Sequence, residues 1–251
     1  TWNAPGMTGS AQLSGALTTV NGILAVVSTG SPTVRELRLA TSNGTAYTAT
    51  FGSLQITGGV LTLIGSGTTG ANTALVSVTG NVSLSNTGII DMNGGAAAGS
   101  VTLNIGGDLT TSGTSTIQKS FGATATINFN KSTGTQVFTQ TAGTISNNIN
   151  WNVGTGATNN TLQLGSNINL GTGAGVFTVL SGATIDYGAT RVLSGSGTFV
   201  LNAGGILTTA NTGGVNTSIN TTTQTLNAGA NYIFNGSNAQ VTGTSLTSAN
   251  N

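Results

Sequence analysis

Short segments in which every second residue is apolar recur along the chain, and glycine-rich corners separate these segments. In residues 199–210, FVLNAGGILTTA, Phe199 and Leu201 alternate with the residues between them, as in a strand with two different faces. Gly204 and Gly205 then allow backbone angles that are closed to other residues. The same strand–corner–strand unit recurs in four further segments: residues 56–63, 101–111, 180–186 and 224–234.

The corners recur at a nearly regular interval along the chain, and this interval indicates the fold. Most of the corner glycines follow one another at intervals of about 20–25 residues, which is the length of one coil of a solenoid. Glycine interrupts nearly every stretch of the chain, so no helix is predicted. These features predict an all-β fold, a right-handed parallel β-helix (β-solenoid) of roughly ten coils.

A β-sandwich is the alternative architecture, since evenly spaced short strands suit it as well. Hairpins favour Asn-Gly pairs between strands of matched length. Only four such pairs occur, which favours the solenoid: Asn21-Gly22, Asn43-Gly44, Asn93-Gly94 and Asn235-Gly236.

The same alternation predicts which side chains fill the interior. Equivalent apolar positions recur on either side of each corner, so we expect them to point into one shared internal column. Eleven residues are assigned to this column: Leu103, Ile105, Leu109, Ile127, Phe129, Leu180, Ile185, Leu201, Leu207, Leu226 and Phe234.

A longer repeat is superimposed on the coil period. Residues 101–145 and 199–247 resemble two copies of one block, and the offset between matching positions drifts slightly along the block. The second copy reaches the end of the sequence. We therefore expect a single β-helix domain over residues 1–251 that belongs to a longer repetitive protein and continues beyond Asn251.

The charge content excludes several classes of partner. Charged residues make up 4% of the chain and the net charge is +1, against about 25% charged residues in typical soluble domains. Such a chain has no basic surface for nucleic acid.

Other features of the composition exclude further classes. The apolar runs are too short to span a membrane. The absence of cysteine excludes disulfides and thiolate metal sites. Threonine, serine and asparagine must cover the surface.

The acidic residues are too few and too scattered to predict catalysis. Glu36, Asp91, Asp108 and Asp186 are unevenly spaced along the chain, and with coils of about 20–25 residues they need not share a face. Without histidine or cysteine, a serine or thiol nucleophile has no general base. The sequence therefore predicts no enzyme, no catalytic residues, no cofactor and no metal.

Five residues are candidate glycan contacts. Trp151, Tyr187 and Tyr232 are aromatic side chains of the kind on which sugars stack, although packing in the core is the simpler interpretation of Trp151. Arg35 and Arg38 belong to the one charge cluster of the chain. They are candidates for an acidic glycan, or else for an ordinary exposed strand face.

Thr-x-Thr pairs raise the question of ice binding, which needs one pair per coil. The pairs begin at Thr48, Thr124, Thr133 and Thr242. Their spacing is irregular, so ice binding ranks low among the hypotheses.

Three segments resemble the repeat units of the very large, repetitive, adhesin-like cell-surface proteins of Bacteroidetes, which are typically exported by the type IX system. They are residues 133–151 (TGTQVFTQTAGTISNNINW), 177–188 (FTVLSGATIDYG) and 226–243 (LNAGANYIFNGSNAQVTG). The resemblance implies an extracellular, β-helical, surface-exposed shaft, and it carries no catalytic residues.

The hypothesis that follows is a structural segment of an extracellular bacterial adhesin or surface filament, with a rigid and nearly uncharged surface. Its expected partners are surface glycans, or neighbouring copies of itself end to end. A glycan-binding module is the alternative. A β-helical carbohydrate-active enzyme and an ice-binding protein rank below it.

Overall fold

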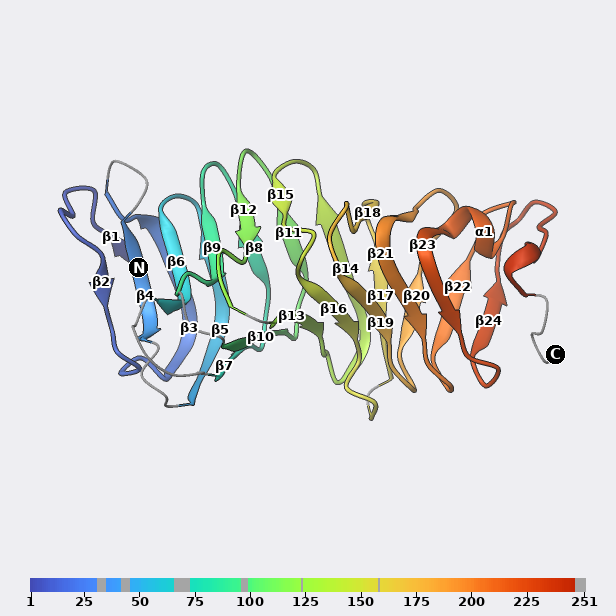
Figure 1. Cartoon of the computed structure of the whole chain (residues 1–251), viewed down its shortest axis with the longest axis horizontal. Helices are drawn as coiled ribbons and strands as arrows, with labels where there is room; N and C mark the ends of the chain where they lie inside the picture. The colour runs from blue at the N-terminus through green and yellow to red at the C-terminus, as the bar shows by residue number, and fades with distance from the viewer. Residues whose placement is uncertain are drawn as a thin grey trace. The chain divides into compact units, whose positions relative to one another are not determined.

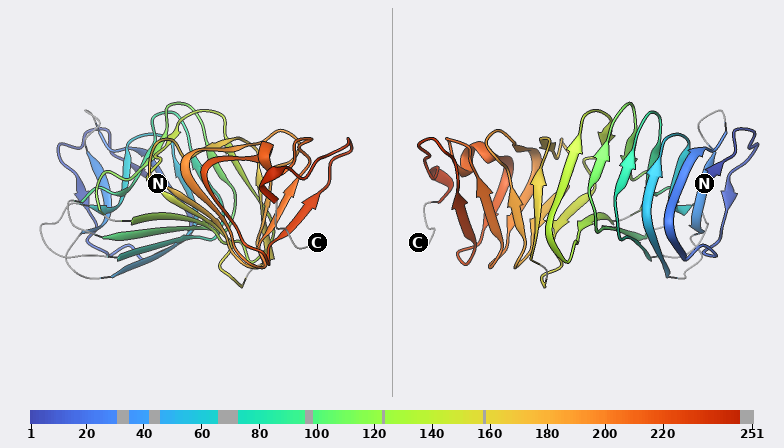
Figure 2. Two further views of the ribbon diagram at one scale, coloured as in Figure 1. Left: turned by 45° about the vertical axis from the view of Figure 1, so that its right-hand side comes forward. Right: turned by 180° about the vertical axis from the view of Figure 1, so that it is seen from behind.

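The computed structural model describes residues 1–30, 35–41, 46–65, 73–95, 99–122, 124–157 and 159–246. The expectations for Asn43-Gly44 and for residues 247–251 lie outside these ranges. The chain is nearly all β, and parallel strands stack as a β-solenoid of about eight turns (Figure 1, Figure 2). The predicted fold class is confirmed, with fewer turns than expected.

The solenoid divides into two compact units. Unit 1 comprises Thr1–Ile127 and Gln140–Ile149, and unit 2 comprises Asn128–Thr139 and Asn150–Asn251. The sequence predicts a single domain over residues 1–251.

Unit 1 is built from strands that pair in parallel with the equivalent strand of the next turn. For example, Leu75 of one turn lies beside Thr48 of the previous turn and Thr102 of the following turn. Its strands are β1 (Trp2–Asn3), β2 (Ala11–Gln12), β3 (Thr19–Ser28), β4 (Glu36–Thr41), β5 (Tyr47–Ile56), β6 (Val60–Gly65), β7 (Thr73–Val78), β8 (Val82–Leu84), β9 (Ile89–Asn93), β10 (Ser100–Ile105), β11 (Leu109–Thr111), β12 (Thr116–Gln118) and β15 (Thr144–Ile145).

Each turn of unit 1 contributes up to three strands, and we number the faces by the order of strands within a turn. The first face holds the starts of β3 and β5, with β7 and β10. The second holds the ends of β3 and β5, with β8 and β11. The third is a six-stranded parallel sheet in the order β15-β12-β9-β6-β4-β2.

Unit 2 repeats this plan. Its first face holds β16, β19 and the ends of β21 and β23, and its second holds β14, β17, β20, β22 and β24. Its elements are β14 (Thr133–Gln140, whose last residue belongs to unit 1), β16 (Asn150–Val153), β17 (Asn159–Leu164), β18 (Ile168–Asn169), β19 (Val176–Val179), β20 (Thr184–Asp186), β21 (Leu193–Leu201), β22 (Ile206–Thr209), α1 (Val215–Ser218), β23 (Ile219–Leu226), β24 (Asn231–Phe234) and the 3-10 turn η1 (Thr244–Leu246). Strand β13 (Thr124–Phe129) is divided between the units.

The turns vary in length, which explains why there are fewer of them than predicted. Phe177 pairs in register with Phe199, a separation close to the predicted period. The register partners of unit 1 are farther apart in sequence, as the pairs Leu75–Thr102 and Thr19–Thr50 show. The corner glycines alone do not reveal this variation, because the length of a turn is given by the register between strands of adjacent turns.

The predicted core is confirmed at eight of its eleven positions. These eight side chains are fully buried: Leu103, Ile105, Leu109, Ile127, Phe129, Ile185, Leu201 and Leu207. Leu180, Leu226 and Phe234 are half-buried instead. Leu180 follows β19 at a corner. Leu226 lies on β23 and Phe234 on β24. Among the strand pairs whose register is described, β23 pairs only with β21 and β24 only with β22.

One short helix departs from the prediction that the chain has none. Helix α1 follows Gly214, whose φ is +64° and whose added Cβ would lie 2.0 Å from the Val241 carbonyl oxygen. Only glycine suits both conditions. Ser218, at the end of α1, is buried and hydrogen-bonds the Thr209 hydroxyl at 2.8 Å, so the helix is fixed by polar contacts.

The proposed duplication stays a prediction. Both blocks begin with strand, corner and strand, as β10–β11 and β21–β22. After these, the first block continues with strand β12 and the second with helix α1.

Candidate functional site

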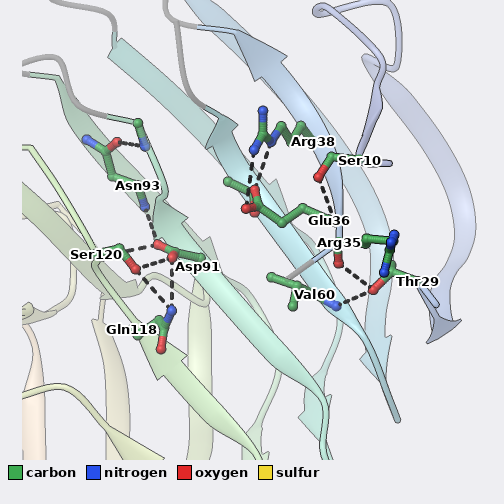
Figure 3. A network of polar contacts seen from close by, with 12 residues as sticks. Ser10, Thr29, Arg35, Glu36, Arg38, Val60, Asp91, Asn93, Gln118 and Ser120 are labelled. Atoms are coloured by element: carbon green, nitrogen blue, oxygen red, sulfur yellow. Dashed lines mark hydrogen bonds and ion pairs between the residues drawn. The ribbon is translucent and has the colours of Figure 1, made fainter. Parts of the chain in front are cut away.

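The third face of unit 1 carries a row of polar side chains on neighbouring strands. Arg38 of β4 lies beside Thr62 of β6, Thr62 lies beside Asp91 of β9, and Asp91 lies beside Gln118 of β12. All four project away from the internal column, because the alternate positions are occupied by buried apolar residues: Leu37, Leu61, Ile90 and Ile117. Figure 3 shows this region.

Glu36 forms a bidentate pair with an arginine of its own strand. Arg38 donates from Nε to Oε2 at 2.9 Å and from Nη2 to Oε1 at 3.3 Å. The Thr62 hydroxyl also donates to Glu36 Oε2, at 2.7 Å. The two charged side chains are 16% and 20% exposed, so this carboxylate is both compensated and largely shielded from water.

Asp91 is the more buried acid, at 5% exposed. Its Oδ1 accepts the backbone N–H of Asn93 at 3.1 Å and that of Ser120 at 3.3 Å. Its Oδ2 accepts the Gln118 amide at 2.9 Å and the Ser120 hydroxyl. Four hydrogen bonds thus replace the water that a buried carboxylate loses.

Two further side chains connect the start of β4 to its surroundings. The Thr29 hydroxyl donates to the Arg35 carbonyl at 2.7 Å and accepts the Val60 N–H at 3.0 Å. The Ser10 hydroxyl accepts the Glu36 N–H at 3.1 Å (Figure 3). The polar network therefore links the backbones of successive turns.

The carboxylates of Glu36 and Asp91 lie close together, although the spacing along the sequence did not require any two acids to share a face. A Cβ added to Gly94 would lie 3.6 Å from Glu36 Oε2 and 3.7 Å from Asp91 Cγ, so the two carboxyl groups are no farther apart than the sum of these distances. Carboxylate pairs about 5–9.5 Å apart serve glycoside hydrolysis. Glu36 is the register partner of Val60, and Val60 is that of Ile89, so two successive turns bring Glu36 and Asp91 to the same face.

The hydrogen bonds of this pair nevertheless favour a structural role. Glu36 is held by Arg38 and Thr62, and Asp91 by four donors, so each carboxylate is engaged within the protein. Among the residues that the structure describes, no group of three or more acidic side chains could hold a metal ion. Of the other acids, Asp186 accepts the Gly188 N–H at 2.9 Å, as expected for an acid that caps a turn.

Two of the candidate glycan contacts are inside the protein. Trp151 is 3% exposed and stacks on Phe129 and Phe177, at centroid distances of 6.0 and 6.1 Å, with the Phe138 ring edge-on at 5.3 Å. Tyr187 is 0% exposed, and burial raises the pKa of its phenol. Neither ring presents a face to a sugar, because both continue the inward alternation of their strands.

The other three candidates are partly exposed. Arg35 and Arg38 belong to unit 1, where the charge of Arg38 is compensated by Glu36. Tyr232 lies on β24 of unit 2, and burial of its ring raises its pKa. The structure therefore does not place the five predicted residues in one site.

A neutral pocket that the sequence does not predict lies near the start of unit 1. Its volume is about 300 Å³, and hydroxyl-bearing residues dominate its lining. The Tyr47 phenol donates a hydrogen bond to the Leu17 carbonyl, and burial raises its pKa to about 12. The lining residues come from three separate segments of the chain: Ser14, Gly15, Thr18, Ala40, Thr41, Ala46, Tyr47 and Thr48.

Comparisons with protein-family models, curated proteins and solved structures found no match. In the described part of the chain, no helix is long and apolar enough to cross a membrane.

Proposed function

We propose that this chain is a structural segment of an extracellular bacterial adhesin or surface filament, and that it acts by presenting a rigid, nearly uncharged surface. The observation that carries the proposal is the internal stack of large side chains, repeated from turn to turn. The resemblance of residues 133–151, 177–188 and 226–243 to repeats of Bacteroidetes surface proteins points in the same direction.

The stack is clearest in unit 2. The rings of Phe129, Trp151, Phe177 and Phe199 follow one another at centroid distances of 6.0 to 6.1 Å and interplanar angles of 21° to 24°. Aromatic pairs of this kind contribute about 0.5–1.5 kcal/mol each beyond the burial of their area. Each turn is therefore coupled to its neighbours by packing as well as by strand hydrogen bonds, which suits a segment that must resist bending.

Side-chain ladders add to this coupling on the outer surface. The Asn152 amide donates to Asn128 at 2.9 Å, and the Asn104 amide donates to Ser77 at 3.2 Å. Both bonds join adjacent turns without using charge. The stability of a surface that is held by such bonds should depend little on ionic strength, because salt screens charges and leaves neutral hydrogen bonds largely unaffected.

Surface labelling and binding assays test the proposal. Antibodies against the purified chain should label intact, non-permeabilised source cells. Cells or surface glycans that bind the chain should do so equally at low and high ionic strength. Labelling confined to permeabilised cells, or turnover of a polysaccharide, would refute the structural role.

The mechanical part of the proposal needs a separate measurement. The chain should be displayed between a cell-surface anchor and a reporter adhesin, beside a version that lacks the complete turn between the register partners Thr48 and Leu75. Pulling on the reporter should give stepwise unfolding at high force, with a contour length reduced by the deleted turn. Extension without resistance would contradict a rigid segment.

A further inference from the structure

On three of the four strands of the first face in unit 2, namely β19, β21 and β23, the outward positions form a small regular array. Three strands of successive turns contribute two side chains each, and the strands are in register. One row contains Val176, Thr198 and Thr223, and the other contains Thr178, Val200 and Thr225.

The first face of unit 1 has the same organisation. Its strands β5, β7 and β10 are again in register, with two outward side chains per strand. One row contains Thr48, Leu75 and Thr102, and the other contains Thr50, Ser77 and Asn104.

The geometry of each array follows from the backbone. Equivalent residues of adjacent turns are about 4.8 Å apart, and alternate residues of one strand are about 6.6 Å apart. Threonine and valine are branched at Cβ and restricted at χ1, so their methyl and hydroxyl groups are held at these spacings. In unit 2 all six positions of the array are threonine or valine.

No charged side chain occupies these rows. Charged residues of nearby strands lie on other faces: Glu36 and Arg38 on the third face of unit 1, and Asp186 on the second face of unit 2. Charged groups impose their own hydration shells, whereas methyl groups are surrounded by water that hydrogen-bonds to itself. A neighbouring hydroxyl can donate to and accept from such water.

We propose that the first face of each unit binds the surface of ice crystals. The ligand is crystalline water, which offers hydrogen-bonding oxygens at regular spacings and no charge. The face lacks the features that other partners need: its described rows have no aromatic or arginine anchor for a protein and no basic residue for an acidic polymer. This activity goes beyond the structural role proposed above and does not depend on it.

The structure also explains why the irregular spacing of the Thr-x-Thr pairs along the chain argued against ice binding. The Thr48 and Thr124 pairs lie at the starts of strands β5 and β13, but Thr133 lies on β14 of the second face. Meanwhile the pair Thr223 and Thr225 belongs to the array. The relevant regularity is the register between turns, which is preserved although the turns differ in length.

Ice affinity tests this directly with the full chain. The wild-type chain should enter a slowly growing ice phase, inhibit ice recrystallisation and shape single ice crystals. Thr198→Lys, at the centre of the array of unit 2, and Leu75→Lys, at that of unit 1, should together abolish all three effects. The matched control is Thr184→Lys with Gln55→Lys, which places the same charges on outward positions of the second face and should leave all three unchanged.

Circular dichroism and urea unfolding of each variant establish that it is folded. A wild-type chain that is excluded from ice would overturn the proposal. Equal loss in the array and control variants would also overturn it, as would binding to crystalline cellulose or chitin without binding to ice.

Discussion

Replacing Phe177 by alanine should be among the most destabilising single substitutions in unit 2. The side chain is 0% exposed, and its ring stacks on both Trp151 and Phe199 at centroid distances of 6.1 Å. Truncating a buried phenylalanine costs about 3–5 kcal/mol. Because two ring contacts are lost together, we expect a value toward the upper end of this range.

A second substitution distinguishes the contribution of the ring contacts to stability from that of the buried volume. Phe177→Leu keeps much of the buried volume but removes both ring contacts, so it should cost about 1–3 kcal/mol. Thr178→Ala, at the next position of β19, faces outward and should change the free energy of unfolding by less than about 0.5 kcal/mol.

Urea unfolding followed by tryptophan fluorescence measures these differences. A Trp2→Phe background leaves Trp151, inside the stack, as the single tryptophan, and the Trp2 indole N–H has no hydrogen-bond partner to lose. With a slope near 2 kcal/mol per molar urea, Phe177→Ala should lower the midpoint by about 2 M. A cost below about 1 kcal/mol, closer to that of an ordinary surface change, would show that the stack does not couple the turns.

Three single-site changes test other features of the two units. Leu201→Ala should cost about 2–5 kcal/mol and its half-buried register partner Leu226→Ala less than half as much, as measured by urea unfolding; equal costs would contradict one-sided packing of β23. Asp91→Asn should cost about 1.5–3 kcal/mol, because an amide cannot accept from all four donors, and a neutral result would show that the charge is not needed. The pKa of Tyr47 is raised by burial from 10.0 to about 12, so the folded state holds the phenolic proton more tightly. The stability that this group contributes should be complete below about pH 10 and fall as the pH rises through about 12, and a Tyr47→Phe variant should lack this part of the decrease.

The fold and most of its core could be predicted because both depend on local alternation. In residues 199–210 the side chains of Phe199, Leu201 and Leu207 are inward and fully buried, as the spacing of two predicts. Leu180 shows the limit of that argument. It is apolar and next to a strand, but it stands at the corner, where the strand phase no longer decides which way a side chain points.

The candidate site could not be predicted, because it depends on register between turns. Glu36 and Asp91 are far apart in sequence, and only the turn lengths of this particular unit bring them to the same face. Strand pairing conveys this information, and a period averaged over the whole chain does not. For Trp151 and Tyr187, the alternation itself indicated an inward position, and residue type alone suggested a ligand contact.

The unequal turn lengths also determine where this protein tolerates new sequence. One residue inserted within β19 would exchange its two faces and turn Phe177 toward solvent. At the corners, successive turns already differ in length, as the register partners Phe177–Phe199 and Thr19–Thr50 show, while the strands remain paired. Natural variants of this chain should therefore differ in length at the corners, and those corners offer grafting positions where foreign peptides can be displayed on an unchanged frame.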